Sequence, residues 1–227
     1  MTAFPAFFSA RRITQKRQTK PMKKRILVIC GDQYHLSQDV MAGLAAMNDG
    51  ELVFTQAPQG SVDFLTEAFD AVVLAKLNVT SADDASPWMT TQLDDQLEAL
   101  IANGAGLLVV HAGTVGYSSS PKLRRITGGS FIQHPEPCTV RLEPTNRSSV
   151  STAPFEVWDE HYFVETDPEI EVFLESASVH GRQPAGWLNR HQDGTICVLT
   201  PGHFAEVWQD TNFHELLRFG IKSVLNG

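Results

Sequence analysis

The chain has 227 residues, 42% of them hydrophobic, and its 26 acidic and 18 basic side chains give a formal net charge of −8. This length and composition predict one globular domain whose core needs no disulfide or metal, and they exclude collagen-like, disordered and disulfide-stapled classes. The apolar runs are of strand length, well short of the roughly 20 residues that a membrane-spanning helix needs, so no membrane association is expected.

The start of the chain differs in composition from the remainder. Residues 1–25 hold eight of the basic side chains and no acidic one, and they lack apolar periodicity. We expect residues 1–22 to be a disordered basic extension, with Met22 as a candidate natural start, and residues 23–227 to form a single domain. Beyond residue 25 only 10 basic side chains face 26 acidic ones. That excess argues against nucleic-acid binding, which needs clustered Lys and Arg.

The first half of the body alternates strand and helix patterns. Four short apolar runs predict buried strands: residues 24–30, 51–55, 71–75 and 106–110. Three segments between them have apolar side chains at helical spacing: residues 37–47, 62–69 and 88–102. Ser37 is a candidate cap of the first helix, and Asn103-Gly104 closes the third. This order predicts an α/β fold with a parallel sheet and helices on both faces.

The second half contains more strand patterns. Five segments fit this description, several of them with half-exposed alternation: residues 136–142, 155–164, 171–175, 185–189 and 195–199. Residues 191–194 form a hairpin turn before the last of these, and apolar spacing from Phe213 to Val224 predicts a terminal helix. The apolar face of that helix is compatible with a homodimer but does not require one.

Histidines follow three of the predicted strands. His35 comes after the first strand, close to Asp32, while His111 directly follows the strand at 106–110 and His203 follows the one at 195–199. Ligands of parallel sheets bind beyond the carboxyl ends of the strands, and imidazole suits proton transfer or metal binding near neutral pH. The sequence therefore predicts a site there, with structural histidines as the alternative.

The segment from Trp158 to Tyr162 concentrates polar and aromatic side chains. On a continuous strand, Asp159 and His161 would face one side and Trp158, Glu160 and Tyr162 the other. A carboxylate beside an aromatic ring suits a sugar, although an ordinary sheet surface would give the same pattern. Two loops could add ligand contacts, with His134 before Pro135 in one and Trp187 in the other; solvated loops are the alternative.

Other motifs are missing. GxGxxG, GxxxxGKS, GxSxG and HExxH do not occur, which weakens nucleotide-cofactor and serine-hydrolase hypotheses. Cys30, Cys138 and Cys197 show no CxxC spacing, and two of them lie in apolar strands. Reduced buried thiols and a cytoplasmic setting are therefore expected.

Several ordered motifs together resemble one family. RILVICGDQYHLSQDVMAGL, GLLVVHAGTVGY, LRRITGGSFIQHPE, FEVWDEHYFVE and VLTPGHFAEVW are similar, in that order, to the trehalose-utilisation (ThuA-like) family. The resemblance implies a flavodoxin-like three-layer sandwich with a mostly parallel sheet, similar to class I glutamine amidotransferases. It also implies a role in the metabolism of trehalose-type disaccharides, including their 3-keto derivatives.

This sequence departs from the amidotransferases at the nucleophile. Those enzymes have a cysteine in the sharp turn after a strand, but the matching turn here places His111 after Val110 and before Ala112. Pro201, Gly202 and His203 resemble the segment that carries the triad histidine. Without a thiol, hydrolysis of glutamine through a thioester is not expected.

Three hypotheses follow for the function. The first is a sugar-processing enzyme with a small-molecule carbohydrate as its partner. In it, His111 and His203 are acid/base groups and Glu160 is their carboxylate partner. The expected substrate contacts are Asp32, His35, His134, His161 and Trp187.

The second hypothesis is a divalent metal site, for example for zinc. Its candidate ligands are His35, His161 and His203, beside Glu160 or Asp32. The third is a sugar-binding or regulatory protein without catalysis, because one fold hosts unrelated functions.

Overall fold

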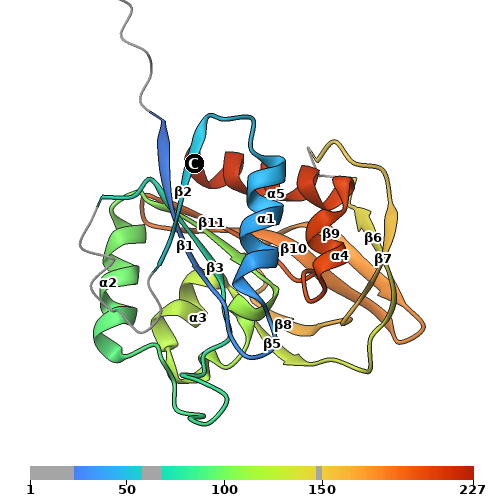
Figure 1. Ribbon diagram of the computed structural model, residues 1–227, viewed down its shortest axis with the longest axis horizontal. Helices are drawn as coiled ribbons and strands as arrows, with labels where there is room; N and C mark the ends of the chain where they lie inside the picture. The colour runs from blue at the N-terminus through green and yellow to red at the C-terminus, as the bar shows by residue number, and fades with distance from the viewer. Residues whose placement is uncertain (1–22, 58–67, 147–149) are drawn as a thin grey trace, which may run out of the picture.

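The computed structural model describes residues 23–57, 68–146 and 150–227. A central sheet lies between two groups of helices (Figure 1). The basic extension predicted at residues 1–22 lies outside the described residues, as does nearly all of the helix predicted at residues 62–69.

Within the described ranges, one nine-stranded sheet has the order β2-β1-β3-β4-β11-β10-β9-β6-β7. One half of it is parallel: β2 (Leu52–Gln56), β1 (Lys24–Cys30), β3 (Ala71–Ala75), β4 (Gly106–Val110) and β11 (Gly194–Leu199). The other half is antiparallel: β10 (Gly181–His191), β9 (Glu171–Ser178), β6 (Cys138–Pro144) and β7 (Phe155–Asp159). A separate pair joins β5 (Gly129–Gln133) to β8 (Phe163–Thr166).

The helices cover both faces of the parallel half. On one face lie α1 (Ser37–Met47), α4 (Ala205–Gln209) and α5 (Thr211–Leu225). On the other face lie α2 (Thr91–Ala102) and α3 (Pro121–Thr127). Two short 3₁₀ helices, η2 (His111–Thr114) and η3 (Tyr117–Ser119), connect β4 to α3. The predicted α/β fold class is therefore confirmed.

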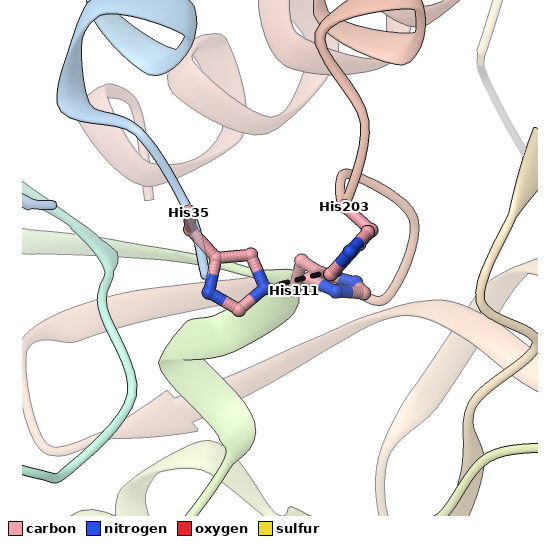
Figure 2. Close-up of side chains that lie close together, drawn as sticks. All are labelled: His35, His111 and His203. Atoms are coloured by element: carbon pink, nitrogen blue, oxygen red, sulfur yellow. Dashed lines mark hydrogen bonds between the residues drawn. The ribbon is translucent and has the colours of Figure 1, made fainter. Parts of the chain in front are cut away.

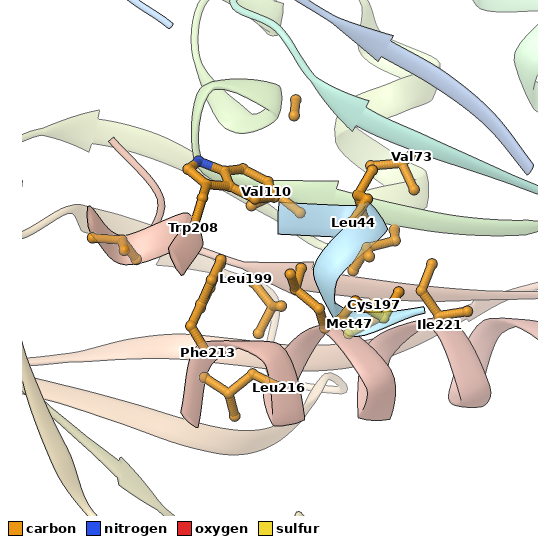
Figure 3. Close-up of a cluster of buried hydrophobic side chains, with 14 of the residues drawn as sticks. Leu44, Met47, Val73, Val110, Cys197, Leu199, Trp208, Phe213, Leu216 and Ile221 are labelled. Atoms are coloured by element: carbon orange, nitrogen blue, oxygen red, sulfur yellow. The ribbon is translucent and has the colours of Figure 1, made fainter. Parts of the chain in front are cut away.

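The alternation of side chains along β1 divides the core into two layers. Ile26, Val28 and Cys30 belong to the cluster that packs against α1 and α5, while Leu27 and Ile29 belong to the cluster under α2 and α3. Successive strand residues point to opposite faces, so a strand covered by helices on both sides is apolar throughout. Figure 3 shows the first cluster, with Leu44 and Trp208 packed over the sheet.

Two local predictions are wrong. The strand expected at residues 155–164 is two strands, because β7 ends at Asp159 and pairs with β6, while β8 begins at Phe163 and pairs with β5. Ser37 does not cap α1: it is the first helical residue, and the cap position belongs to Leu36, whose side chain cannot accept a hydrogen bond. The short elements α3, β5 and α4 were not predicted, since each has too few residues for a recognisable period.

None of the described helices is long and apolar enough to cross a lipid bilayer.

Gly43 sets the closest approach between α1 and α4. A Cβ atom at Gly43 would lie 2.8 Å from the backbone oxygen and from a ring carbon of Trp208. We expect Gly43→Ala to lower the free energy of unfolding by about 1–3 kcal/mol through overpacking, although alanine has the higher helix propensity. Urea denaturation measures the change.

Ala45→Gly, at an exposed position of the same helix, is the control and should cost about 1 kcal/mol from propensity alone. A gain of stability in Gly43→Ala would contradict the close contact.

Candidate functional site

Three histidines converge at the carboxyl edge of the parallel strands. His35 follows β1, His111 begins η2 after β4, and His203 follows β11. One ring nitrogen from each lies within 4.8 Å of the others, and Nε2 of His35 is 3.1 Å from Nδ1 of His203. In Figure 2 the rings of His35 and His203 approach from two loops above His111. The predicted convergence of these three histidines is therefore present in the structure.

A strained turn presents His111. Its φ angle is 44°, a conformation that non-glycine residues rarely adopt outside functional turns. The turn can pack this tightly because Gly113 has no Cβ; a Cβ there would lie 2.2 Å from the backbone oxygen of Leu74. Nδ1 of His111 lies 2.7 Å from the carbonyl oxygen of Thr200. A carbonyl only accepts hydrogen bonds, so Nδ1 donates and Nε2 faces the cluster.

Asp32 orients His35. Its Oδ1 lies 2.8 Å from Nδ1 of His35 and also accepts the backbone N–H of Tyr34, while Oδ2 accepts the N–H of Leu77. Burial opposes the ionisation of Asp32, but these hydrogen bonds outweigh it and lower its pKa. Burial also lowers the pKa of His35, as do the nearby rings of His111 and His203. His35 is therefore a neutral imidazole whose Nε2 lone pair points at His203.

Glu160 completes the centre from the loop after β7. Its Oε2 lies 3.3 Å from Nε2 of His111 and 3.3 Å from Nδ1 of His203. Burial disfavours the charge of Glu160, but the two histidines more than compensate and hold its pKa well below the usual range. The hydrogen bond that His203 donates to Glu160 in turn raises the pKa of His203. The result is an ionised carboxylate paired with a protonated His203.

Tyr162 and His134 line the same centre. The hydroxyl of Tyr162 lies 2.8 Å from Nε2 of His111, and the two rings stack with centroids 4.1 Å apart. Burial and the charges of Glu160 and Asp159 raise the pKa of Tyr162, so its phenol keeps its proton. Nε2 of His134 lies 3.5 Å from Oε1 of Glu160, and its side chain is 36% exposed, the most open of this group.

Asp159 holds the turn that carries His203. It is fully buried, and its carboxylate accepts the backbone N–H groups of Gly202 at 2.8 Å and of His203 at 3.0 Å. Burial raises the pKa of Asp159, although these N–H groups and the charge of His111 act in the opposite direction. Gly202 has a φ angle of 136°, which only glycine adopts readily. The end of β7 and the loop after β11 are thus joined directly beside Glu160.

Two expected ligand contacts do not belong to this centre. Trp187 is 0% exposed, and its indole N–H donates to the carbonyl of Thr127 inside the core. His161 is 1% exposed, and its ring nitrogens bond to the hydroxyls of Ser178 and Ser176. Both expectations are corrected: neither side chain is available to a ligand, and the histidine set is His35, His111 and His203 without His161.

The end of β7 explains the error about His161. Beyond Asp159 the backbone leaves the strand, so the two-residue alternation no longer applies. Glu160 and Tyr162 turn toward His111, while Trp158 stays exposed on the sheet. The roles of Tyr162 and Asp159 were not predicted, although both lie in the polar segment that drew attention to Glu160.

The buried thiols take no part in this centre. Cys30, Cys138 and Cys197 are all free. Burial raises the pKa of the Cys30 thiol to about 12, with Lys76 opposing the effect, and burial also raises the pKa of Cys197. Protonated thiols are poor nucleophiles, so neither cysteine replaces the one that is absent from the His111 turn.

Comparison with known proteins identifies the family. The model of the ThuA family, described as "Trehalose utilisation", matches residues 25–223. The chain belongs to the ThuA family. No curated protein matches at a significant level.

Solved structures share the fold of this ThuA-family chain. A ThuA-like protein of Parabacteroides merdae has a TM-score of 0.73 and 17% identity, covering 90% of this chain and 91% of that one. A ThuA-like protein of Bacteroides uniformis has a TM-score of 0.67 and 17% identity, covering 96% and 94%. A β-galactosidase of Rahnella sp. R3 has a TM-score of 0.62 and 9% identity, and the match covers 89% of this chain but 32% of the larger enzyme. At these identities the likeness concerns the fold.

Removal of the Asp159 carboxylate tests the link between β7 and the His203 turn. Asp159→Ala leaves two buried N–H groups without their acceptor, so we expect the free energy of unfolding to fall by at least about 2 kcal/mol. Chemical denaturation measures the loss. Glu156→Ala makes the same type of truncation on the exposed face of the same strand and should stay within about 0.5 kcal/mol. Equal effects of the two variants would show that the turn does not depend on Asp159.

Proposed function

We propose that this ThuA-family chain is a carbohydrate-processing enzyme that moves a proton at a sugar carbon next to a carbonyl. The observation that carries the proposal is the position of Glu160, whose Oε2 lies 3.3 Å from both His111 and His203 at the carboxyl edge of the sheet. A carboxylate beside a protonated histidine suits this chemistry, because one group accepts the proton while the other stabilises the charge that develops on oxygen.

The family supports the class of substrate. Its description is trehalose utilisation, so trehalose-type disaccharides and their 3-keto derivatives are the first candidates. A keto group acidifies the neighbouring C–H bond, and an enzyme can then isomerise the sugar without a nucleotide cofactor. The amidotransferase reaction is not proposed, because His111 lies in the turn where a thiol nucleophile is required.

The reaction divides into two proton transfers. Glu160 accepts the proton from the carbon beside the carbonyl, and the electron pair of the C–H bond moves onto the carbonyl oxygen. The positive charge of protonated His203 stabilises that oxygen. Glu160 then returns the proton to the former carbonyl carbon, while His203 gives a proton to the carbonyl oxygen and takes one from the hydroxyl on the first carbon, which moves the keto group by one carbon and gives an isomer of the sugar. A substrate oxygen that takes over the contact of His203 frees Glu160 from its ion pair, so Glu160 acts as a base only with the sugar in place.

Substitution of the carboxylate tests the proposal. Glu160→Gln keeps the size of the side chain but cannot accept the proton, so turnover should fall by about 10²–10⁴-fold. Proton NMR in D₂O with trehalose and 3-keto-trehalose as probes follows both product formation and deuterium incorporation next to the carbonyl. Glu156→Gln, on the exposed face of β7, is the matched control and should retain wild-type rates.

Three outcomes have a defined meaning. Loss of exchange in Glu160→Gln alone supports the proton-transfer role. Unchanged exchange in Glu160→Gln overturns it. Saturable sugar binding by the wild type, retained in His203→Ala and without product or exchange for any sugar, also overturns it and favours a sugar-binding or regulatory protein.

A further inference from the structure

The nitrogen and oxygen atoms around His203 have the spacing of a metal coordination sphere. Nε2 of His35 is 3.1 Å from Nδ1 of His203, and Oε2 of Glu160 is 3.3 Å from both Nδ1 of His203 and Nε2 of His111. A tetrahedral zinc ion with bonds of about 2.0–2.1 Å places its ligand atoms about 3.3 Å apart. Three ligand-to-ligand distances therefore already match, and all three histidine nitrogens lie within 4.8 Å of one another.

Nδ1 of His35 and Nδ1 of His111 point away from the centre, and each has a hydrogen-bond acceptor, as in metal-binding histidines. Nδ1 of His35 contacts the carboxylate of Asp32, and Nδ1 of His111 contacts the carbonyl of Thr200. Each of these partners accepts a hydrogen bond, so the ring proton lies on Nδ1 and the lone pair of Nε2 is directed at the centre. Ligating histidines nearly always donate their other N–H to a carboxylate or a backbone carbonyl.

Single protons serve the lone pairs of His35 and His111 separately. His35 and His111 are 8% and 1% exposed; Nε2 of His35 faces Nδ1 of His203, and Nε2 of His111 faces the hydroxyl of Tyr162. Oε2 of Glu160 lies against both His111 and His203, so these donor atoms surround one point. A divalent ion at this point satisfies all four groups at once.

We propose that His35, His111 and His203 bind a divalent transition-metal ion, with Glu160 as a fourth ligand that a substrate oxygen displaces, which frees the carboxylate for the proton transfer. Three imidazoles with one carboxylate suit zinc, and related divalent ions bind the same donors. The hydroxyl of Tyr162, which lies 2.8 Å from Nε2 of His111, gives up that contact when the ion binds. The existence of the metal site does not depend on the proposed function, but the role of the ion does. In that function the ion supplies the positive charge that stabilises the sugar oxygen, and His203 acts as a metal ligand.

The test uses the full chain after treatment with a chelator. Zn²⁺ and Co²⁺ are added separately, binding is measured by calorimetry and elemental analysis, and X-ray absorption of the zinc-loaded protein counts the imidazole ligands. We expect one ion per chain, three imidazoles, and visible Co²⁺ bands of tetrahedral intensity. His35→Gln and His203→Gln each remove a metal ligand, so each should weaken metal binding at least about 100-fold. Loss of a residue that only hydrogen-bonds a ligand typically weakens metal binding by about 10–100-fold.

The matched control is His180→Ala, which removes an exposed histidine on the turn before β10 and should bind the ion like the wild type. The absence of stoichiometric binding, or fewer than three imidazoles in the absorption spectrum, overturns the proposal even if the glutamine variants fail to fold. Unchanged affinity in folded His35→Gln and His203→Gln also overturns it.

The same samples separate this inference from the proposed function. If one ion binds through three imidazoles but no sugar exchanges deuterium, the metal site stands and the sugar chemistry fails. If exchange persists at full rate in chelator-treated protein that binds no ion, the proton transfer stands and the metal site fails.

Discussion

The carboxylate of Asp159 connects the two halves of the molecule at the point where the site forms. It ends β7 in the antiparallel half and accepts the N–H groups of Gly202 and His203, which follow β11 in the parallel half. Neither half could form the centre alone, since Glu160 and Tyr162 come from one side and the three histidines from the other. A buried carboxylate is costly unless hydrogen bonds satisfy it, and here those bonds fix the backbone on which His203 is mounted.

Each histidine of the centre has a hydrogen-bond acceptor at a fixed position. Asp32 holds His35 from behind, Thr200 holds His111, and Glu160 faces the open side of the cluster. His35 and His111 therefore each have one nitrogen committed to a fixed acceptor, and their other nitrogens lie with Nδ1 of His203 around one point. Such pre-orientation is what acid/base and metal chemistry both need, because the groups do not have to be reorganised during the reaction.

The turn after β4 shows how one fold can change its chemistry. The strained conformation at His111 and the tight packing of Gly113 against Leu74 form a sharp turn that presents the His111 side chain to the centre. An imidazole there cannot form the thioester of an amidotransferase, but it can bind an ion or position a proton. Membership of the ThuA family is consistent with this change, while the likeness to distant structures extends to the fold alone.

The sequence by itself determined four strands of the parallel half of the sheet, the presence of helices on both faces and the edge at which the histidines meet. Those features follow from local periods: buried strands such as β3 and β4 are continuous apolar runs, and residues directly after parallel strands share one edge. Only the tertiary structure decided that β7 ends at Asp159, which turns Glu160 and Tyr162 into the centre. The same holds for the burial of Trp187 and His161 in hydrogen-bonded interior positions. The end of β7 depends on its pairing with β6 and on the hydrogen bonds that Asp159 accepts from Gly202 and His203. These partners are distant in the sequence, so the residues next to Asp159 do not reveal them.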